Sequence, residues 1–330
     1  MEFKSTIDLL MSGTGLSSDQ AYELMQDFGA ATFNEAQNAA LIISISSRDL
    51  TINEVKGFRK ALFDLSMPCG LESYDAIDLC GTGGDGKNTF NISTLSSFVV
   101  AGAGYKVAKH GNYGVSSLSG SSNVMEQLGY QFSNDPSKLK REIDACNITF
   151  LHAPLFHPAL KHVGSVRRQL GIKTIFNILG PLVNPARTKR QLVGVYSLRL
   201  ARLYHFILQE EGKKYRVIHS LDGYDEVSLT APTMTYSSLG EDLLQPETFG
   251  TAAINPVKLY GGNTLEESAD MFKRIIGKDG TPEQNAVVIA NASLAIQCFE
   301  QDSSIEECRV LAEESLMSGR AEQTLKKLIG

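Results

Sequence analysis

The sequence of 330 residues has no tryptophan, few cysteines and no long apolar run. The lack of tryptophan excludes little, because it is the rarest residue in proteins. The five cysteines are scattered and form no Cys-x-x-Cys pair, so we expect reduced thiols in a cytoplasmic protein, with neither a zinc site nor a disulfide framework. The longest apolar run, Ala39–Ile45, is too short to span a membrane, so we expect no membrane partner. Met1 leads directly into Glu2 and Lys4, from which we expect no signal peptide.

An excess of basic residues is also missing. The chain has 31 Lys and Arg against 37 Asp and Glu, a formal net charge of −6, which argues against a broad nucleic-acid-binding surface but not against one small basic pocket. A hydrophobic content of 42% and a charged content of 21% are typical of a soluble globular protein with a full core. The length allows one large domain or two.

The first 68 residues are predicted to be wholly helical. Three capping boxes predict where helices begin: Ser17-x-x-Gln20, Thr32-x-x-Glu35 and Thr51-x-x-Glu54. Each precedes apolar residues at helical spacing. The segment Met67–Gly70 contains proline and glycine and is predicted to be a linker.

After residue 75 the pattern changes to alternating short apolar strands and amphipathic helices. The predicted strands are Ala76–Cys80, Lys106–Lys109, Ile148–His152, Gln191–Tyr196 and Tyr215–His219, with a possible hairpin around Thr233–Ser238. The predicted helices between them are Thr94–Ala103, Ser119–Leu128, Pro136–Cys146 and Leu198–Glu211. The C-terminal tail is predicted to be helical, over Thr264–Ile276, Pro282–Phe299, Ser304–Met317 and Ala321–Leu328. We therefore predict an α/β fold, with a small all-helical domain and a larger domain built on a mostly parallel sheet that is covered on both faces.

A glycine-rich segment follows the first predicted strand. Four of the six residues in Gly81–Gly86 are glycine, and a helix is predicted to begin near Ser93. Glycine lets backbone N–H groups approach an anion closely, and the new helix adds a positive dipole end, so together they predict a phosphate cradle. The spacing fits neither the dinucleotide motif nor a P-loop, and a plain strand-to-helix turn is the alternative interpretation.

Two further segments end predicted strands and should meet the glycine segment at one edge of the sheet. Lys109 and His110 lead into a run of hydroxyl residues from Ser116 to Ser122, which suits oxyanion binding, although a solvated serine-rich turn would look the same. Asp225 and Glu226 are adjacent carboxylates, which suit Mg²⁺ together with a substrate phosphate; acidic pairs are otherwise commonly just solvated.

The role of the region from His157 to Pro185 is open to more than one interpretation. His157 and His162 are five residues apart and do not share a helical face, which argues against a zinc pair. Arg167 or Arg168 could bind a carboxylate in fork geometry, or could lie on an ordinary basic helix surface. Thr174–Pro185 contains Gly-Pro and Asn-Pro bends, and would suit either the face of an aromatic ligand or a structural turn. The sequence shows no signature of covalent catalysis.

Taken together, these motifs resemble the anthranilate phosphoribosyltransferase family, whose members join anthranilate to 5-phosphoribosyl-1-pyrophosphate (PRPP) in tryptophan biosynthesis. The matching segments occur in the family's order: Gly81–Gly86, Phe90–Thr94, Val107–Asn112, His157–Ala159, Thr174–Pro185 and Asp222–Glu226. The resemblance implies a helical domain of residues 1–68 that 162–186 join, and an α/β domain of 69–161 and 187–330 that binds PRPP. It also implies Mg²⁺ as cofactor, anthranilate and PRPP as substrates, and a homodimer formed through the helical domain.

The family's site residues transfer onto the matching positions. PRPP would be held by Gly81, Gly83, Gly84, Asp85, Thr89, Asn91, Ser93, Thr94, Lys109 and Ser121. Anthranilate would be bound by Gly81, His110, Asn112, His157, Arg167 and Gly180, with Arg167 facing its carboxylate. Mg²⁺ would be served by Ser93, Asp225 and Glu226. The chain departs from the family's common residues at Leu118, Asn123 and Leu155, which puts one phosphate contact and the guidance of the aromatic acid in question.

The activity that this resemblance implies needs no covalent catalyst or strong general base, because an aniline nitrogen needs little deprotonation before it attacks. The protein would instead stabilise the departing pyrophosphate and hold the reactants together. Three alternatives remain at this point. A pyrimidine-nucleoside phosphorylase of the same fold is disfavoured because Asp85 stands where that family has valine. A phosphoribosyltransferase for another aromatic amine, or a non-catalytic binder, would share most of these residues.

Overall fold

The computed structural model describes residues 1–114 and 119–330, which group by their contacts into two compact units. The helical unit contains Met1–Pro68 and Ala153–Pro185, and the α/β unit contains Cys69–His152 and Ala186–Gly330. The predicted division placed 153–161 with the larger domain. In the structure these residues belong to the helical unit, because the carbonyl of Phe156 accepts a hydrogen bond from the Met67 N–H at 2.8 Å and both Phe156 and His157 are buried.

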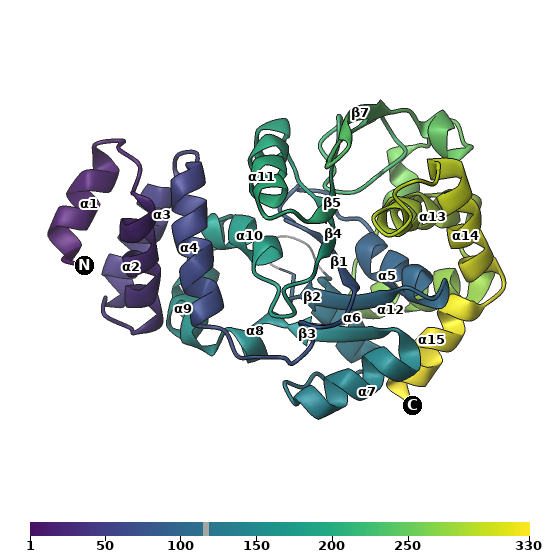
Figure 1. Cartoon of the computed structure of the whole chain (residues 1–330), viewed down its shortest axis with the longest axis horizontal. Coiled ribbons are helices and arrows are strands. Elements are labelled where there is room, and N and C mark those ends of the chain that lie inside the picture. Colours follow the sequence, from purple (N-terminus) through teal and green to yellow (C-terminus); the bar gives the residue numbers. More distant parts are fainter. Residues whose placement is uncertain (115–118) are drawn as a thin grey trace. The chain divides into compact units, whose positions relative to one another are not determined.

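The helical unit is built from short helices (Figure 1). They are α1 (Phe3–Met11), α2 (Ser18–Gly29), α3 (Glu35–Ser46), α4 (Ile52–Asp64), α8 (Ala153–Phe156), α9 (Lys161–Leu170) and α10 (Ile175–Leu179), with 3₁₀ turns η1 (Pro158–Leu160) and η2 (Gly180–Leu182). The capping boxes predicted at Ser17 and Thr51 are confirmed. The one predicted at Thr32 is wrong, because α3 is capped by Asn34, whose Oδ1 accepts from the Gln37 N–H at 2.9 Å. The Thr32 hydroxyl donates instead to Asp27.

The α/β unit contains one seven-stranded sheet in the order β3-β2-β1-β4-β5-β6-β7. The strands are β1 (Ala76–Gly81), β2 (Lys106–Gly111), β3 (Ile148–His152), β4 (Arg190–Gly194), β5 (Lys214–Ser220), β6 (Thr233–Ser237) and β7 (Gly240–Leu244). The first five are parallel, and β6 and β7 extend the sheet as an antiparallel hairpin. The predicted α/β fold class, with a helical domain and a mostly parallel sheet, is confirmed.

Helices lie on both faces of this sheet: α5 and α13 on one side and α11 on the other (Figure 1). The helices of this unit are α5 (Ile92–Gly102), α6 (Ser121–Gln127), α7 (Pro136–Cys146), α11 (Leu198–Glu210), α12 (Leu265–Arg274), α13 (Pro282–Gln297), α14 (Ile305–Met317) and α15 (Arg320–Ile329). Short 3₁₀ turns η3 (Pro246–Phe249) and η4 (Pro256–Leu259) precede α12, and a π-helical turn η5 (Ile275–Asp279) follows it.

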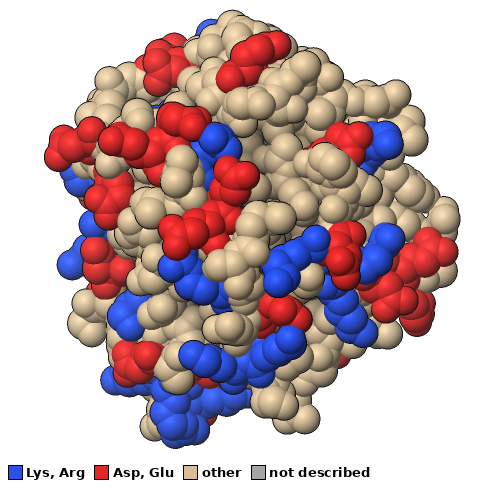
Figure 2. All heavy atoms as spheres, turned by 90° about the vertical axis from the view of Figure 1, so that its right-hand side faces the viewer, with Lys and Arg blue, Asp and Glu red and all other residues tan. Residues whose placement is uncertain are grey.

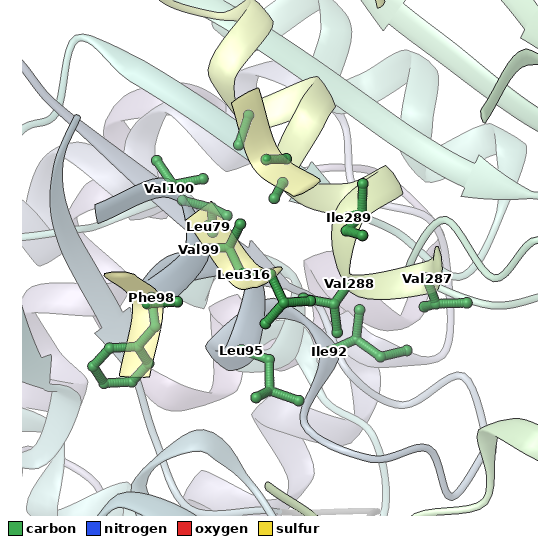
Figure 3. Close-up of a cluster of buried hydrophobic side chains, with 14 of the residues drawn as sticks. Leu79, Ile92, Leu95, Phe98, Val99, Val100, Val287, Val288, Ile289 and Leu316 are labelled. Carbon is green, nitrogen blue, oxygen red and sulfur yellow. The ribbon is translucent and has the colours of Figure 1, made fainter. Parts of the chain in front are cut away.

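Helix α5 is buried on nearly every side, which explains its run of apolar residues. Phe98 and Val99 are fully buried, and in Figure 3 side chains of α5 meet Val288 of α13 and Leu316 of α14. The hydroxyl of Ser96 donates to the Val288 carbonyl at 3.1 Å, so even the polar residues of the helix are satisfied inside the core. This packing fixes the N-terminal end of α5, where the glycine segment enters it.

The surface carries both signs of charge. On the face drawn in Figure 2, acidic and basic side chains are interspersed, and Lys and Arg gather along the lower edge. Basic residues also recur along single helices: α7 contains Lys138, Lys140 and Arg141, and α15 contains Lys326 and Lys327. Within the described residues, none of the helices is both long and apolar enough to cross a membrane.

Candidate active site at the ends of β1 and β4

The chain reverses its direction across the sheet between β1 and β4. From β1 it moves to β2 and β3 on one side, and from β4 it continues to β5 on the other. In open α/β sheets, ligands bind beyond the carboxyl ends of the strands at such a switch point. Both strands end in glycine here, and Gly81 and Gly194 are paired in register. The predicted glycine segment therefore begins where the topology favours a ligand.

Asp225 lies directly over these two glycines. A Cβ on Gly81 would lie 2.5 Å from Asp225 Oδ2, and one on Gly194 would lie 1.5 Å from the Asp225 carbonyl oxygen. The Asp225 carboxylate also accepts a hydrogen bond from the Gly83 N–H at 2.7 Å. The absence of two side chains thus lets the acidic segment that follows β5 come into contact with the glycine segment that follows β1.

Replacement of Gly194 by alanine should test this close approach. The new methyl group would overlap the Asp225 backbone, so we expect about 1–3 kcal/mol of destabilisation and displacement of the Asp225 carboxylate. Urea unfolding would measure the first effect. Gly164→Ala in α9 is the control, because outside its own helix backbone no neighbouring atom lies within 4 Å of its Cβ position. It should be at least as stable as the parent, because alanine favours a helix interior. Equal stability of the Gly194→Ala and Gly164→Ala variants would contradict the contact.

Carboxyl groups gather where these strands end, in a largely buried setting. Burial raises the pKa of Asp225 well above its ordinary range, and the nearby carboxylates of Asp85 and Glu226 raise it further. Burial also raises the pKa of Glu226 to about 7, against the opposing effect of the Lys109 ammonium and hydrogen bonds from Ser93. These carboxylates are therefore in a place where a cation would stabilise their charged forms.

Lys109 supplies a buried positive charge close to these carboxylates. It lies at the end of β2 and donates to the carbonyl of Leu79 and, at 3.3 Å, to the hydroxyl of Ser93 at the start of α5. Burial lowers the pKa of Lys109, while the charges of Asp78, Cys80 and Glu226 raise it. Asp78 of β1 also accepts from the His110 N–H at 3.1 Å, which ties the ends of the two strands together.

The segment after β2 is bound to the residues that link the glycine segment to α5. The amide of Asn91 donates to the Ser119 carbonyl at 3.0 Å. The side-chain oxygen of Asn123 accepts from the N–H groups of Gly114 (2.9 Å) and Gly120 (3.0 Å), so this departure from the family's common aspartate keeps a working acceptor. The predicted oxyanion residues Ser116 and Ser117, and the departure at Leu118, lie outside the described residues.

The structure thus brings together three segments that were predicted to meet. The α/β unit contains Gly81, Gly83, Gly84, Asp85, Thr89, Asn91, Ser93, Thr94, Lys109, His110, Asn112, Ser121, Asp225 and Glu226. The remaining predicted residues, His157, Arg167 and Gly180, lie in the helical unit, as does Leu155, on α8.

Some residues that shape the site were missed from the sequence. Asn291 of α13 is fully buried; its side chain accepts from the Val227 N–H at 3.0 Å and donates to the Val227 carbonyl at 2.9 Å, which holds the residue that follows the acidic pair. Asp78 is a second example. A buried amide in an apolar helix and a carboxylate inside an apolar strand were the signals that could have found them.

A distant segment, residues 259–262, packs against the residues that link the glycine segment to α5. The Phe90 N–H donates to the Leu259 carbonyl (3.1 Å), the Gly261 N–H to the Asn88 carbonyl (2.8 Å), and the Asn88 amide to the Gly262 carbonyl (2.8 Å). Residues 89 and 260 also form an isolated antiparallel bridge. The path from β1 to α5 is therefore held at both ends, by Asp225 at Gly83 and by this segment at Asn88 and Phe90.

The donor set for a metal ion is small. In residues 1–114 and 119–330, no group of three or more His, Cys, Asp or Glu side chains is arranged to hold a metal ion. Such a site is not needed for Mg²⁺, which commonly binds through one or two carboxylates and takes its other ligands from substrate phosphates and water. Asp225 and Glu226 fit that mode.

In the helical unit, His157 and Arg167 are held by contacts within that unit. His157 is buried, and its Nε2 contacts the Val183 carbonyl at 3.2 Å. Burial lowers the pKa of His157 to about 4. The Arg167 guanidinium lies 4.7 Å from the centre of the Phe176 ring, and burial lowers its pKa to about 10.

His157 should make the unfolding of the protein depend on pH. Between pH 6.5 and about pH 4 the unfolded chain binds a proton at this residue and the folded chain does not. The free energy of unfolding should therefore fall by about 3 kcal/mol as the pH is lowered through this window. In urea titrations at several pH values, His157→Gln should lose this part of the dependence, and His162→Gln, an exposed neighbour, should keep it. Equal slopes for His157→Gln and the parent would contradict the buried neutral imidazole.

Comparison with known proteins identifies the family. Residues 4–66 match the helical bundle domain of the glycosyl transferase family, and residues 73–322 match its a/b domain. The anthranilate phosphoribosyltransferase of Flavobacterium psychrophilum is 51% identical over 98% of both chains. Among solved structures, the Thermus thermophilus anthranilate phosphoribosyltransferase is 31% identical with a TM-score of 0.90 over 98% of both chains. The Saccharomyces cerevisiae enzyme in complex with PRPP and Mg is 27% identical, with a TM-score of 0.87 over 99% of this chain and 96% of that one.

These matches cover nearly the whole chain, both in sequence and in structure. They agree with the motifs that meet at the ends of β1 and β4. The chain therefore belongs to the anthranilate phosphoribosyltransferase family, within the glycosyl transferases whose helical bundle and a/b domains it contains.

Proposed function

We propose that this chain transfers the phosphoribosyl group of PRPP to the amine of anthranilate and releases pyrophosphate, the second step of tryptophan biosynthesis from chorismate. The observation that carries the proposal is the hydrogen bond between the Gly83 N–H and the Asp225 carboxylate, at the switch point of the sheet. This contact brings the glycine segment and the acidic pair together, which supports a site for a diphosphate that binds together with a divalent cation.

PRPP would bind along the glycine segment and the N-terminal end of α5. Backbone N–H groups of this segment, other than that of Gly83, which donates to Asp225, and the Lys109 ammonium would donate to phosphate oxygens. The proposed PRPP ligands are Gly81, Gly83, Gly84, Asp85, Thr89, Asn91, Ser93, Thr94, Lys109 and Ser121. The positive φ angles of Gly83 (62°), Gly84 (75°) and Gly86 (75°) support this assignment, because residues with a Cβ rarely adopt such a backbone.

Mg²⁺ would be bound by Asp225, Glu226 and Ser93. The fit rests on burial: two carboxylates with raised pKa values lie next to Asp85, so a cation would relieve their mutual repulsion. When bound with PRPP, Mg²⁺ supplies positive charge that stabilises the leaving pyrophosphate.

The protein's own contribution to the reaction is positioning and electrostatic stabilisation. As the bond from the ribose C1 to pyrophosphate breaks, positive charge develops on the ribose and negative charge on the leaving group. Lys109 and the N–H groups of the glycine segment would stabilise the latter. The amine of anthranilate then attacks C1 and loses one proton to water, and no residue is assigned as a general base. Holding the two reactants in contact can contribute roughly 7–11 kcal/mol.

Anthranilate would be bound by residues of both units. Gly81, His110 and Asn112 lie in the α/β unit, and His157, Arg167 and Gly180 lie in the helical unit. The buried, neutral His157 offers an uncharged surface, and Arg167 offers a guanidinium for the carboxylate of the acceptor. We also propose a homodimer formed through the helical unit, which sedimentation velocity would test.

A fluorescence assay tests the function directly. The protein is mixed with anthranilate, PRPP and Mg²⁺, and the loss of anthranilate fluorescence and the release of pyrophosphate are followed together. Both should occur at equal rates and stop when PRPP or Mg²⁺ is omitted. Release of a free base that depends on phosphate would favour a nucleoside phosphorylase. If another aromatic amine is consumed in preference to anthranilate, that amine replaces anthranilate as the proposed acceptor. Tight PRPP binding with no turnover would favour a non-catalytic binding protein.

A further inference from the structure

Lys87 directly follows the glycine segment, Gly81–Gly86, and its side chain reaches the acidic segment, Asp222–Glu226. Its backbone N–H donates to the Asp85 carboxylate at 2.9 Å, which fixes the turn from which the side chain leaves. Its Nζ lies 4.6 Å from the centre of the Tyr224 ring, and its Cε lies 4.0 Å from the Cβ position of Gly223. The side chain therefore crosses from one segment to the other.

Tyr224 transmits this contact to the acidic pair. It immediately precedes Asp225 and is 5% exposed, and its carbonyl accepts from the Ser220 N–H at 3.1 Å. Its ring is thus held in the core of the α/β unit at a fixed distance from the pair. The acidic segment thus makes two contacts with the chain that follows β1. Asp225 contacts Gly83, and Tyr224 contacts Lys87.

The charges around this contact favour a cation. Asp85, Asp222, Asp225 and Glu226 contribute four carboxylates to the two segments, and Lys109 contributes one buried ammonium. The charges of Asp222 and Asp85 both act on the Tyr224 hydroxyl, so they lie near the ring that Lys87 covers. A lysine held over an aromatic face is attracted by the ring and by these carboxylates together.

We propose that Lys87 is a positioning residue for PRPP binding, which acts through Tyr224 by holding the acidic pair against the glycine segment before the substrate arrives. This inference rests on the proposed function and adds a residue that acts on the affinity for PRPP. Because the contact is made in the free protein, it pre-organises the diphosphate site. Its loss should therefore weaken PRPP binding and leave the chemical step and the affinity for anthranilate nearly unchanged.

The test compares Lys87→Met, which keeps the apolar stem, with Lys87→Arg, which keeps the cation. For Lys87→Met we expect the KM for PRPP and its Kd from calorimetry with Mg²⁺ to rise by about 5- to 10-fold, in line with a partly desolvated cation–π contact. The kcat and the KM for anthranilate should stay within about twofold, and Lys87→Arg should restore the affinity for PRPP. Lys60→Met is the matched control, since it removes a lysine 5.0 Å from the Tyr22 ring in the helical unit and should change neither constant.

A double-mutant cycle asks whether Lys87 acts through the ring. Tyr224→Phe keeps the ring and should bind PRPP like the parent, and Lys87→Met should weaken binding equally in both backgrounds. With Tyr224→Leu, the effect of Lys87→Met should largely disappear. Because Tyr224 is buried, the Leu variant is scored only if its unfolding midpoint shows it folded, and the comparison of Lys87→Met with Lys87→Arg stands without it.

The outcomes separate this inference from the proposed function. Three results would each overturn the role of Lys87: unchanged PRPP affinity in Lys87→Met, failure of Lys87→Arg to restore the affinity, or a loss confined to kcat. Turnover by the parent would in each case leave the proposed function intact. PRPP binding that falls in Lys87→Met, in a protein that does not consume anthranilate, would refute the acceptor and keep the role of Lys87. If the parent protein binds no PRPP, both the proposed function and the role of Lys87 are refuted.

Discussion

Replacement of Asp225 and Glu226 together by Asn and Gln is expected to lower turnover by about 10²- to 10⁴-fold, since charge stabilisation by a metal ion is worth several kcal/mol. The same variant should unfold at a higher urea concentration than the parent at pH 8. Both carboxylates have raised pKa values, so keeping them charged in the folded state at that pH lowers stability, and neutral amides of the same shape remove this penalty. The amide introduced by Asp225→Asn would also keep an oxygen that can accept from the Gly83 N–H.

The opposite signs of the two effects make this variant informative. Its control is Glu313→Gln with Glu314→Gln, an adjacent and exposed acidic pair on α14, which should alter neither activity nor the unfolding midpoint at pH 8 by much. Full turnover at limiting Mg²⁺ would refute the metal role. A large loss of stability would show instead that the pair is a structural element of the fold.

Replacement of Lys109 by methionine is expected to have the second largest effect on activity. It should also lower the stability of the protein. The ammonium lies among Asp78, Glu226, the Leu79 carbonyl and the Ser93 hydroxyl. Removing one partner of a buried charge cluster leaves the others uncompensated, which typically costs about 3–5 kcal/mol. The kcat/KM for PRPP should fall by roughly 10²-fold or more, because a buried cationic donor beside the glycine segment is lost.

Lys106→Met is the matched control for Lys109→Met. Lys106 begins the same strand, β2, at the end away from the candidate site, and its ammonium is bonded to the Ile143 carbonyl at 3.1 Å on a partly exposed surface. It should lose little stability and keep its activity. If Lys109→Met unfolds at the same urea concentration as Lys106→Met, then Lys109 does not hold the buried carboxylates together.

Local sequence signals were enough to find the parallel strands and the segments that follow them. Apolar runs such as Ile148–His152 are bounded by polar residues and helical patterns, and the structure has a strand with those bounds. The glycines of Gly81–Gly86 and the adjacent acids Asp225 and Glu226 stand out because their composition is unusual for a turn. That they meet follows from parallel topology, since all parallel strands end at one edge.

The rest of the site depends on contacts between residues far apart in the chain. Gly194 has no local signal beyond its position at a strand end, and its importance lies in the Asp225 backbone that packs on it. Asn291 is 64 residues from the backbone groups it binds. The start of α3 shows the same limit at short range: Thr32 was the predicted cap, but in the structure Asn34 caps the helix and the Thr32 hydroxyl donates to Asp27.

The pairing of residues 259–262 with Asn88 and Phe90 has a consequence for how the protein is made. Ribosomes build the chain from its N-terminus, so the whole of Gly81–Gly86 leaves the exit tunnel long before the residues that brace Asn88 and Phe90, or the helix that carries Asn291. A nascent chain that stops at residue 255 would hold each proposed PRPP ligand in its sequence and lack the supports that shape them. The protein should thus gain its affinity for PRPP only after the residues up to Asn291 have been made.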